Sequence, residues 1–340
     1  MKRLLALFLS LCLLLPLTAC GQTSKFSKTV LGCFDTVTSI IGYEKNEDAF
    51  LTVASEIEAK LREYHALFSI YDDSKTVNNL KRLNEERSMT ASDALLDFLE
   101  YGILMYEKTN GRMNIAMGAV LSLWHEARTA GTLEPHKAKL PDREALEAAK
   151  AHCSIDSIVI DREKKTVTLT DERVLLDVGA LGKGYAVEMI AKDLEARGIS
   201  GYLINAGGNV RTVGVKGDGS TWSVGVEDPN SDDGLLATLS LSGEALVTSG
   251  SYMRYYYVKG KKYHHIISPD TLMPSEGIVS LTVLSESSAE ADALSTALFT
   301  LSYEDGAALL ADFPEVEAMW LLSDGTLRYT DGFLSKAKPE

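Results

Sequence analysis

The chain has 340 residues and a formal charge of −14 at pH 7, because 48 acidic side chains outnumber 34 basic ones. Nucleic acids and anionic lipid surfaces are bound through basic patches, so this balance argues against both as partners. With 45% hydrophobic residues, the chain can bury a large core in one domain or in two closely packed halves.

The first residues have the composition of a secretory signal. Lys2 and Arg3 precede an apolar run over 4–15, and Leu17-Thr-Ala-Cys20 follows. A basic start, a short apolar core and small residues before a cleavage site are typical of such signals. About twelve apolar residues are too few to span a bilayer, which argues against a transmembrane anchor. We therefore expect a signal peptide over 1–19.

Leu17-Thr-Ala-Cys20 also resembles the lipobox of bacterial lipoproteins. The resemblance implies that Cys20 is lipidated, that 20–28 is a tether, and that the protein lies on the extracytoplasmic face of the cell membrane. Loss of Lys2 and Arg3 would change the charge from −14 to −16, so the acyl anchor and not charge would hold the protein there. We expect Cys33 and Cys153 to be small buried side chains, although a disulfide between them stays open.

After the tether, the residues 29–43 are rich in Val, Ile and Thr and predict a first strand or one arm of a hairpin. Apolar residues at helical spacing then predict helices over 48–67, 93–108 and 142–152. The second of these ends at Asn110-Gly111, a favourable helix terminator, and Pro141 lies near the first turn of the third.

From residue 155 onward the pattern changes to short strands. They are predicted over 157–160, 166–169, 202–204, 222–226, 237–241, 255–258 and 278–284. Helices are predicted over 184–197, 288–301 and 303–312. Helices and mostly antiparallel strands are segregated as much as alternated, so we expect an α+β fold with largely antiparallel sheets and packed helices. No linker is visible, and we expect a single domain over 29–340.

The most informative segment is Asp177-Val-Gly-Ala-Leu-Gly-Lys183-Gly-Tyr, followed by Asn205-Ala-Gly-Gly-Asn209. An apolar run ends in a carboxylate, a glycine-spaced turn follows, and a lysine opens a helical pattern. Small residues let a backbone approach a ligand, and a lysine adds positive charge where helix N–H groups point outward. This arrangement suits a diphosphate. The alternatives are a turn cap for Asp177 and a solvated helix residue for Lys183.

Asp292 and Thr296 lie four residues apart in a predicted helix, so their oxygen atoms face the same side. A carboxylate and a hydroxyl are hard oxygen donors, which suit Mg²⁺ held beside substrate phosphates. The alternative is a carboxylate that stabilises a helix N-terminus, with an incidental threonine.

Further segments accompany these two in a fixed order. They are Phe34-Asp-Thr-Val37, the segment 71–84, Thr109-Asn-Gly-Arg-Met-Asn114, Thr248-Ser-Gly250, His265-Ile-Ile-Ser-Pro269 and Asp292-Ala-Leu-Ser-Thr296. Together they resemble the ApbE family, the FAD:protein FMN transferases of the bacterial cell envelope. The resemblance covers about 30–301 and rests on the number and order of the motifs.

The resemblance implies an ApbE-type (T-fold-like) architecture and Mg²⁺-dependent transfer of FMN from FAD to a Thr or Ser hydroxyl of another envelope protein, with release of AMP. The Mg²⁺ ligands would be Asp292, Thr296 and the backbone oxygen of Ala180. The residues that would contact FAD are Phe34, Tyr71, Arg112, Met113, Asn114, Asp177, Lys183, His265 and Ile266. The general base would be His265 or Asp292, and the sequence does not choose between them.

Three positions depart from the family pattern. Asn114 replaces a usual Asp, while Ser268 and Leu272 replace an Asp and a later glycine. These departures leave open a lipoprotein that only binds or hydrolyses FAD. A second alternative is that Asp292-Ala-Leu-Ser-Thr-Ala is itself a flavin acceptor, which its helical, half-buried pattern argues against. Tyr71 can also be a turn residue, and we expect His264 to be a surface histidine.

Overall fold

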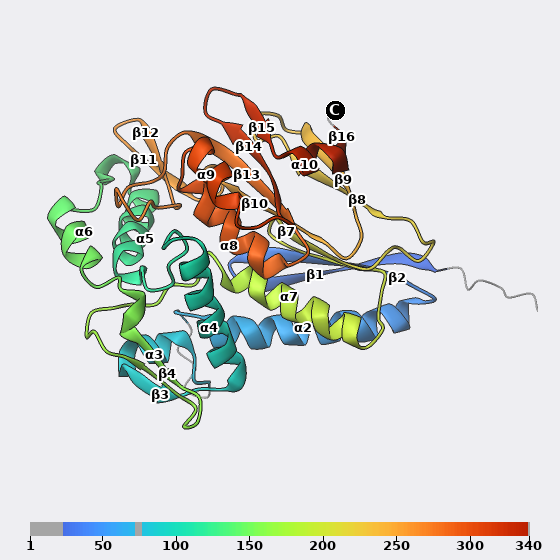
Figure 1. Cartoon of the computed structure of the whole chain (residues 1–340), viewed down its shortest axis with the longest axis horizontal. Coiled ribbons are helices and arrows are strands. Elements are labelled where there is room, and N and C mark those ends of the chain that lie inside the picture. The colour runs from blue at the N-terminus through green and yellow to red at the C-terminus, as the bar shows by residue number, and fades with distance from the viewer. Residues whose placement is uncertain (1–22, 72–76, 339–340) are drawn as a thin grey trace, which may run out of the picture.

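The computed structural model describes residues 23–71 and 77–338, and its centre is an eight-stranded sheet (Figure 1). In spatial order the strands are β1 (Ser24–Cys33), β2 (Thr36–Glu44), β6 (Tyr202–Ala206), β7 (Asn209–Val213), β10 (Ala245–Gly250), β13 (Ile278–Ser285), β14 (Glu317–Leu322) and β15 (Leu327–Tyr329). Every neighbouring pair is antiparallel. The signal peptide and Cys20 lie outside the described residues.

Three helices cover one face of this sheet: α2 (Glu47–Phe68), α7 (Gly182–Ala196) and α8 (Ser288–Phe299) (Figure 1). Helix α2 begins where the Asn46 side chain accepts a hydrogen bond from the Ala49 N–H at 2.9 Å, and its buried residues follow helical spacing, as in Phe50, Ala54 and Ile57. The helices therefore bury their apolar stripes against the sheet.

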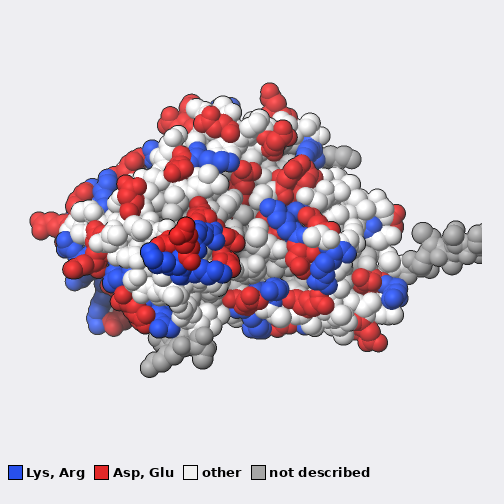
Figure 2. Space-filling model, turned by 60° about the horizontal axis from the view of Figure 1, so that its bottom comes forward, with Lys and Arg blue, Asp and Glu red and all other residues white. Residues whose placement is uncertain are grey.

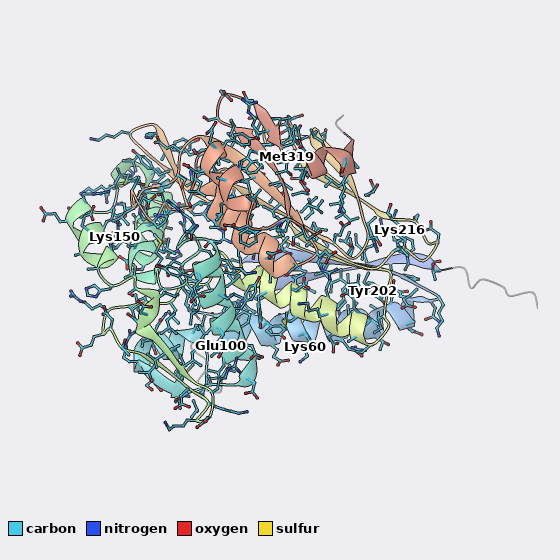
Figure 3. All side chains as sticks on the ribbon, viewed as in Figure 1. Lys60, Glu100, Lys150, Tyr202, Lys216 and Met319 are labelled. Carbon is cyan, nitrogen blue, oxygen red and sulfur yellow. The ribbon has the colours of Figure 1, made fainter. Side chains whose placement is uncertain are left out.

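The opposite face is covered by a small sheet of β8 (Trp222–Glu227), β9 (Leu235–Leu241) and β16 (Ala337–Lys338). Central strands are thus buried on both sides, and successive residues alternate between two cores. Tyr202 lies in the core beneath α2 and α7, whereas Met319 lies in the core beneath β8 and β9 (Figure 3). The sheet is consequently a rigid platform.

The remaining elements pack around this framework. They are α3 (Leu80–Glu86), β3 (Ser88–Thr90), α4 (Asp93–Lys108), α5 (Gly118–Leu133), α6 (Arg143–Lys150), β4 (Ile158–Asp161), β5 (Thr166–Leu169), β11 (Tyr255–Val258), β12 (Lys261–His264), α9 (Tyr303–Leu310) and α10 (Asp331–Lys336), with α10 on the β9 side of the large sheet. Strands β3, β5 and β4 form a three-stranded sheet, and β11 and β12 form a hairpin. On the face shown in Figure 2, basic and acidic side chains are interspersed.

The predicted α+β class is confirmed, as are the helices α2, α4, α6, α7, α8 and α9 to within about two residues at each end. The predicted tether over 20–28 is wrong from Ser24 onward, because Ser24 to Lys28 pair with Glu44 to Ile40 in the β1–β2 hairpin. An edge strand tolerates polar side chains, which is why its composition looked like a linker. The single domain over 29–340 stays a prediction. Among residues 23–71 and 77–338, no helix is long and apolar enough to cross a bilayer.

Candidate functional site

The side chain of Asp292 lies where α8 meets the first turn of α7, and only 5% of the residue is exposed. Its Oδ1 accepts a hydrogen bond from Lys183 Nζ at 2.9 Å, and its Oδ2 accepts one from the Gly184 N–H at 2.7 Å. The backbone N–H groups of a first helical turn carry partial positive charge. The carboxylate is thus held by a full and a partial positive charge from α7.

Gly184 makes this close approach of the two helices sterically feasible. A Cβ atom at this position would lie 2.3 Å from Asp292 Cβ and 2.5 Å from the carbonyl oxygen of Ser288. Any side chain would therefore push α8 away from α7. The glycine after Lys183 serves the contact between helices, which is a different reason from the ligand approach that the sequence suggested.

The bend before α7 is built by Asp177. Its Oδ1 accepts a hydrogen bond from the Gly179 N–H at 2.9 Å, and its own N–H donates to the Ile115 carbonyl at 2.9 Å. Burial raises the pKa of the Asp177 carboxyl, and the Gly179 hydrogen bond opposes that shift. Asp177 therefore caps the turn that carries Ala180, three residues before Lys183.

Helix α8 is fixed to the sheet through the serines of two predicted motifs. Ser295 Oγ lies 2.8 Å from Ser249 Oγ of β10 and donates to the Asp292 carbonyl at 2.9 Å. Thr296, four residues after Asp292 on α8, is only partly buried. The Thr248-Ser-Gly250 motif thus sets the height of Asp292 and Thr296 above the sheet.

A second cluster lies between Tyr71 and α5. The Tyr71 and His125 rings are 5.5 Å apart, and Arg128 Nη2 lies 3.1 Å from His125 Nδ1. Tyr71 is 57% exposed, so a face of its ring is accessible. Burial raises the pKa of Tyr71, and the nearby carboxylates of Asp177 and Asp35 raise it further.

Arg128 and Arg254 line one cavity of about 690 Å³ together with Thr129, Thr132, Leu133, Tyr252, Met253 and Tyr255. Within the part of the chain that the structure describes, neither arginine forms an ion pair with a carboxylate. Burial lowers the pKa of Arg128, and the charge of Arg254 lowers it further. This cationic wall was not predicted, because the helix α5 was missed and no motif in the sequence pointed to Arg128 or Arg254.

His265 is tied to the backbone of Arg254. The backbone N–H of His265 donates to the Arg254 carbonyl oxygen at 3.1 Å, and the ring Nδ1 lies 3.2 Å from the same oxygen. A carbonyl oxygen only accepts hydrogen bonds, so Nδ1 carries the proton and Nε2 has the free lone pair. Burial and the charges of Arg254 and Arg128 lower the pKa of His265 to about 3. The ring is therefore neutral at pH 7.

The neighbouring His264 points the other way, as alternation along β12 requires. Its Nε2 lies 2.7 Å from the Ser275 carbonyl oxygen, and its ring packs edge-on against Phe299 with centroids 5.8 Å apart. It is 7% exposed. The prediction of a surface histidine is wrong, because β12 lies over the C-terminal end of α8.

Phe34 lies in the β1–β2 turn, against His65 of α2. Phe34 and Asp35 have φ angles of 54° and 51°, and such a two-residue turn normally uses Asn-Gly. The Phe34 N–H donates to His65 Nδ1 at 3.1 Å, and the two rings pack edge to face. A Cβ atom at Gly207 would lie 1.9 Å from Thr36 Oγ1, so the β6–β7 turn packs directly on this hairpin.

Three of the predicted FAD contacts have side chains that are buried or hydrogen-bonded within the protein. Met113 is 2% exposed and Ile266 is 5% exposed, and both lie in the largest hydrophobic core. Asn114 Nδ2 donates to the Cys153 carbonyl at 2.9 Å, and its Oδ1 accepts from the Ala116 N–H at 2.8 Å. Contacts of Met113 and Ile266 with a ligand would therefore come from the backbone, whereas the Asn114 amide keeps one N–H donor and one lone pair. Arg112 forms an ion pair with Asp270.

The unusual Ser268 and Leu272 both have structural roles. Ser268 Oγ accepts a hydrogen bond from the Asp270 N–H at 3.3 Å, as an aspartate at this position would. Leu272 has a φ of 60°, a conformation that favours glycine, yet its side chain is 1% exposed in a core with Trp124. The loop keeps its turn, and burial offsets the backbone strain at Leu272.

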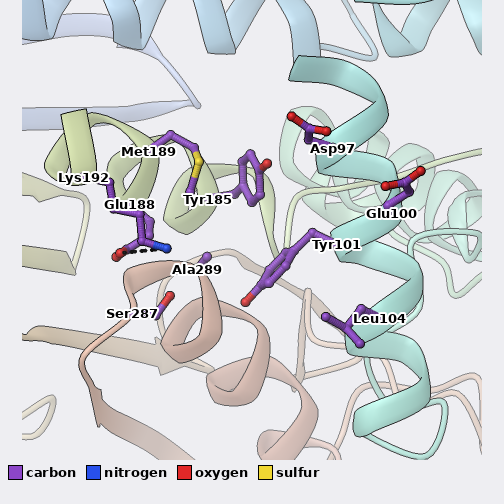
Figure 4. Close-up of a pocket in the computed structure, with 10 residues that line it drawn as sticks. All are labelled: Asp97, Glu100, Tyr101, Leu104, Tyr185, Glu188, Met189, Lys192, Ser287 and Ala289. Atoms are coloured by element: carbon purple, nitrogen blue, oxygen red, sulfur yellow. Dashed lines mark ion pairs between the residues drawn. The ribbon is translucent and has the colours of Figure 1, made fainter. Parts of the chain in front are cut away.

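A cavity of about 480 Å³ lies elsewhere, between α4, α7 and the start of α8 (Figure 4). Its lining includes Tyr101, Tyr185 and Glu188, and none of the predicted site residues. Glu188 Oε2 accepts hydrogen bonds from Arg211 Nε at 3.1 Å and from the Ser288 N–H at 2.7 Å. Glu188 of α7 is therefore hydrogen-bonded both to β7 and to the start of α8.

Comparisons with known proteins show the family and the fold of this chain. Residues 34–320 match the ApbE family. An FAD:protein FMN transferase of Treponema pallidum is 29% identical over 96% of this chain and 93% of its own length. One of Escherichia coli is 30% identical over 78% of this chain and 75% of its own length. The crystal structure of an ApbE protein from Thermotoga maritima superposes with a TM-score of 0.81 at 26% identity, covering 93% of this chain and all of that one. A Vibrio cholerae flavin transferase shares the fold, with a TM-score of 0.75 over 92% and 99% of the two chains at 23% identity.

The fold and the relatives thus define an α+β enzyme of the transferase class. The chain belongs to the ApbE family. The family resemblance that the motifs predicted is confirmed. The roles of the individual site residues stay predictions.

Proposed function

We propose that the protein transfers FMN from FAD to a Thr or Ser hydroxyl of another envelope protein, with Mg²⁺ as cofactor and AMP as the leaving product. The observation that carries the proposal is the contact of Asp292 with the first turn of α7, directly after the Asp177 bend. Relatives over most of the chain are FAD:protein FMN transferases. The predicted diphosphate-binding turn and the predicted metal-binding carboxylate therefore belong to one site.

The residues at this junction fit a divalent cation. Asp292 supplies a deeply placed carboxylate, Thr296 supplies a hydroxyl one turn further along α8, and Ala180 supplies a carbonyl oxygen from the bend. These are the hard oxygen donors that Mg²⁺ prefers. Gly184 lets α8 approach α7 closely at Asp292, and the proposal requires the Thr296 and Ala180 oxygens to face the same cation. When bound, Mg²⁺ would neutralise charge on the diphosphate oxygens.

Lys183 would bind the FAD diphosphate from the start of α7, where the helix N–H groups add to its charge. Tyr71 offers an exposed ring for stacking on a flavin or adenine ring, which is worth about 1–3 kcal/mol per base. The carboxylates of Asp177 and of Asp35, the neighbour of Phe34, both lie close enough to Tyr71 to raise its pKa, consistent with contacts of this region to one nucleotide.

The acceptor hydroxyl must lose a proton as it attacks the FMN-side phosphorus, while the P–O bond to AMP breaks. His265 is the better candidate for the base, because no described residue hydrogen-bonds to its Nε2 lone pair, whereas both Asp292 oxygens already accept hydrogen bonds. A bound diphosphate near Arg254 and Arg128 would offset the charges that lower the pKa of His265.

The proposed setting is the extracytoplasmic face of the cell membrane. The signal-like residues 1–19 and the lipobox-like Leu17-Thr-Ala-Cys20 support a lipid anchor on Cys20. Mass spectrometry of the protein from its native membrane would detect the acylated N-terminal cysteine.

The proposal is tested by incubating the protein with FAD and Mg²⁺, with and without candidate envelope proteins of the host. Transfer predicts AMP release and a flavin-labelled acceptor. Free FMN with AMP and no labelled acceptor would indicate hydrolysis. The absence of both AMP and a labelled acceptor would indicate binding alone. Intact mass of the protein itself tests the acceptor alternative, which the burial of Asp292 and Ser295 in α8 argues against.

A further inference from the structure

Lys183 and Asp292 form an ion pair inside the proposed metal site. Lys183 Nζ lies 2.9 Å from Asp292 Oδ1, and the two side chains are 19% and 7% exposed. The second oxygen, Oδ2, accepts the Gly184 N–H. The ammonium group therefore sits on the carboxylate that the proposed function assigns to Mg²⁺.

An ammonium group and a divalent cation cannot both take full advantage of one buried carboxylate. The two positive charges repel each other most where water screens them least. Mg²⁺ also requires short, near-octahedral contacts, which a donor already seated on Oδ1 obstructs. Binding of the cation is favoured when the lysine moves away.

Once FAD is present, the Lys183 ammonium group can bind a phosphate in place of the Asp292 carboxylate. The lysine side chain is flexible, partly exposed, and attached to the first turn of α7, where the diphosphate is proposed to bind. The Gly184 hydrogen bond to Oδ2 comes from the backbone and does not depend on the lysine. Asp292 therefore keeps its position when Lys183 turns toward a phosphate.

We propose that Lys183 is an internal competitor of the divalent cation: its ammonium group holds Asp292 until the FAD diphosphate draws it away. This inference rests on the proposed function. It makes Mg²⁺ binding weak before FAD and strong with FAD, because each ligand favours the same position of one side chain.

The test measures Mg²⁺ binding to the purified protein by calorimetry in the absence of FAD. Lys183→Met removes the competing charge, and we expect its Kd for Mg²⁺ to fall about tenfold, within the range usual for linked sites. The matched control is Lys192→Met, which removes an equal charge from the same helix. Lys192 is 61% exposed and lies 3.7 Å from Glu188, not from Asp292. Its Kd should change by less than about twofold.

Unchanged or weaker Mg²⁺ binding in Lys183→Met would overturn the inference, since the lysine would then help to build the site. Equal tightening in both variants would also overturn it, since only overall charge would matter. If Lys183→Met does not fold, Lys183→Gln removes the charge and keeps a hydrogen-bond donor. Lys183→Arg keeps the charge and should not tighten binding.

Failure of this inference can be told apart from failure of the proposed function. Wild-type protein that binds Mg²⁺ with FAD, while Lys183→Met gains nothing without FAD, contradicts only the competition. Wild-type protein that binds no Mg²⁺ with or without FAD contradicts the metal site itself, and the competition with it.

Discussion

At the scale of single residues, charge and hydrogen bonding decide which side chains are available for chemistry. His265 and Asp292 were equal candidates for the base in the sequence. They differ in the structure because Asp292 accepts hydrogen bonds on both oxygens, whereas His265 uses only Nδ1 within residues 23–71 and 77–338. Such occupancy depends on partners far apart along the chain, so sequence spacing does not reveal it.

The first prediction concerns Arg254→Gln. Burial is the main reason that the pKa of His265 is about 3 rather than 6.5, and the charge of Arg254 is the next. Removing that charge should raise the pKa of His265 while leaving it below 6.5, because burial and the Arg254 carbonyl remain. NMR titration of the His265 ring measures this, with Arg328→Gln as a distant control.

The same change has a consequence for acid stability. Because the pKa of His265 is lower in the folded chain than in the unfolded chain, the unfolded state binds the proton first as the pH falls. The contribution to stability is present above pH 6.5 and is lost as the pH falls from there toward 3. The Arg254→Gln protein should lose less stability over this range than the wild type. An unchanged dependence of stability on pH would contradict the role of the Arg254 charge in lowering the pKa of His265.

The second prediction concerns Asn114→Asp, which restores the residue usual in the family. The amide Nδ2 donates to the Cys153 carbonyl, and a carboxylate would place an acceptor against that acceptor. We expect the free energy of unfolding to fall by about 1–3 kcal/mol in urea denaturation. The exposed Asn230→Asp is the control, with a change within about 0.5 kcal/mol. A fully stable Asn114→Asp protein would show that the amide is dispensable.

At the scale of elements, the decisive feature is the crossing of α7 and α8. Sequence patterns predicted both helices, but the contact joins Lys183 to Asp292 across 109 positions, and no local pattern encodes it. Only the family resemblance suggested that the two segments meet. Helix α5 was missed because its glycines at 118 and 131 and its lack of a side-chain cap weaken the helical signal.

The third prediction tests this crossing with two glycines of one helical turn. Gly184→Ala would place a Cβ 2.3 Å from Asp292 Cβ, so it should separate the helices, cost about 1–3 kcal/mol of stability and abolish Mg²⁺ binding. Gly182→Ala meets its nearest atom at 3.5 Å, an ordinary contact, and should preserve both properties. Thermal unfolding and calorimetry measure the two effects. Equal stability and equal Mg²⁺ binding of the two variants would show that the close contact of α7 and α8 at Gly184 controls neither property.

At the scale of the whole molecule, the eight-stranded sheet supports the two helices, α7 and α8, that carry Lys183 and Asp292. The α+β class and most strand positions followed from β-branched runs and turn residues. The extent of the sheet did not, because four of its strands, β7, β10, β14 and β15, were not predicted, and their pairing joins segments that are distant along the chain. The cationic cavity of Arg128 and Arg254 was also beyond prediction, since α5 and the segment after β10 meet only in the folded chain.

The central claim is that Asp292, Thr296 and the Ala180 carbonyl hold a divalent cation beside the FAD diphosphate. The most direct measurement is a crystal structure with FAD and Mn²⁺, located by its anomalous signal. The claim predicts one peak about 2.1 Å from all three oxygen atoms, in contact with the diphosphate, with Lys183 turned from Asp292 toward a phosphate. A peak at other residues, or a diphosphate bound away from the first turn of α7, would contradict it.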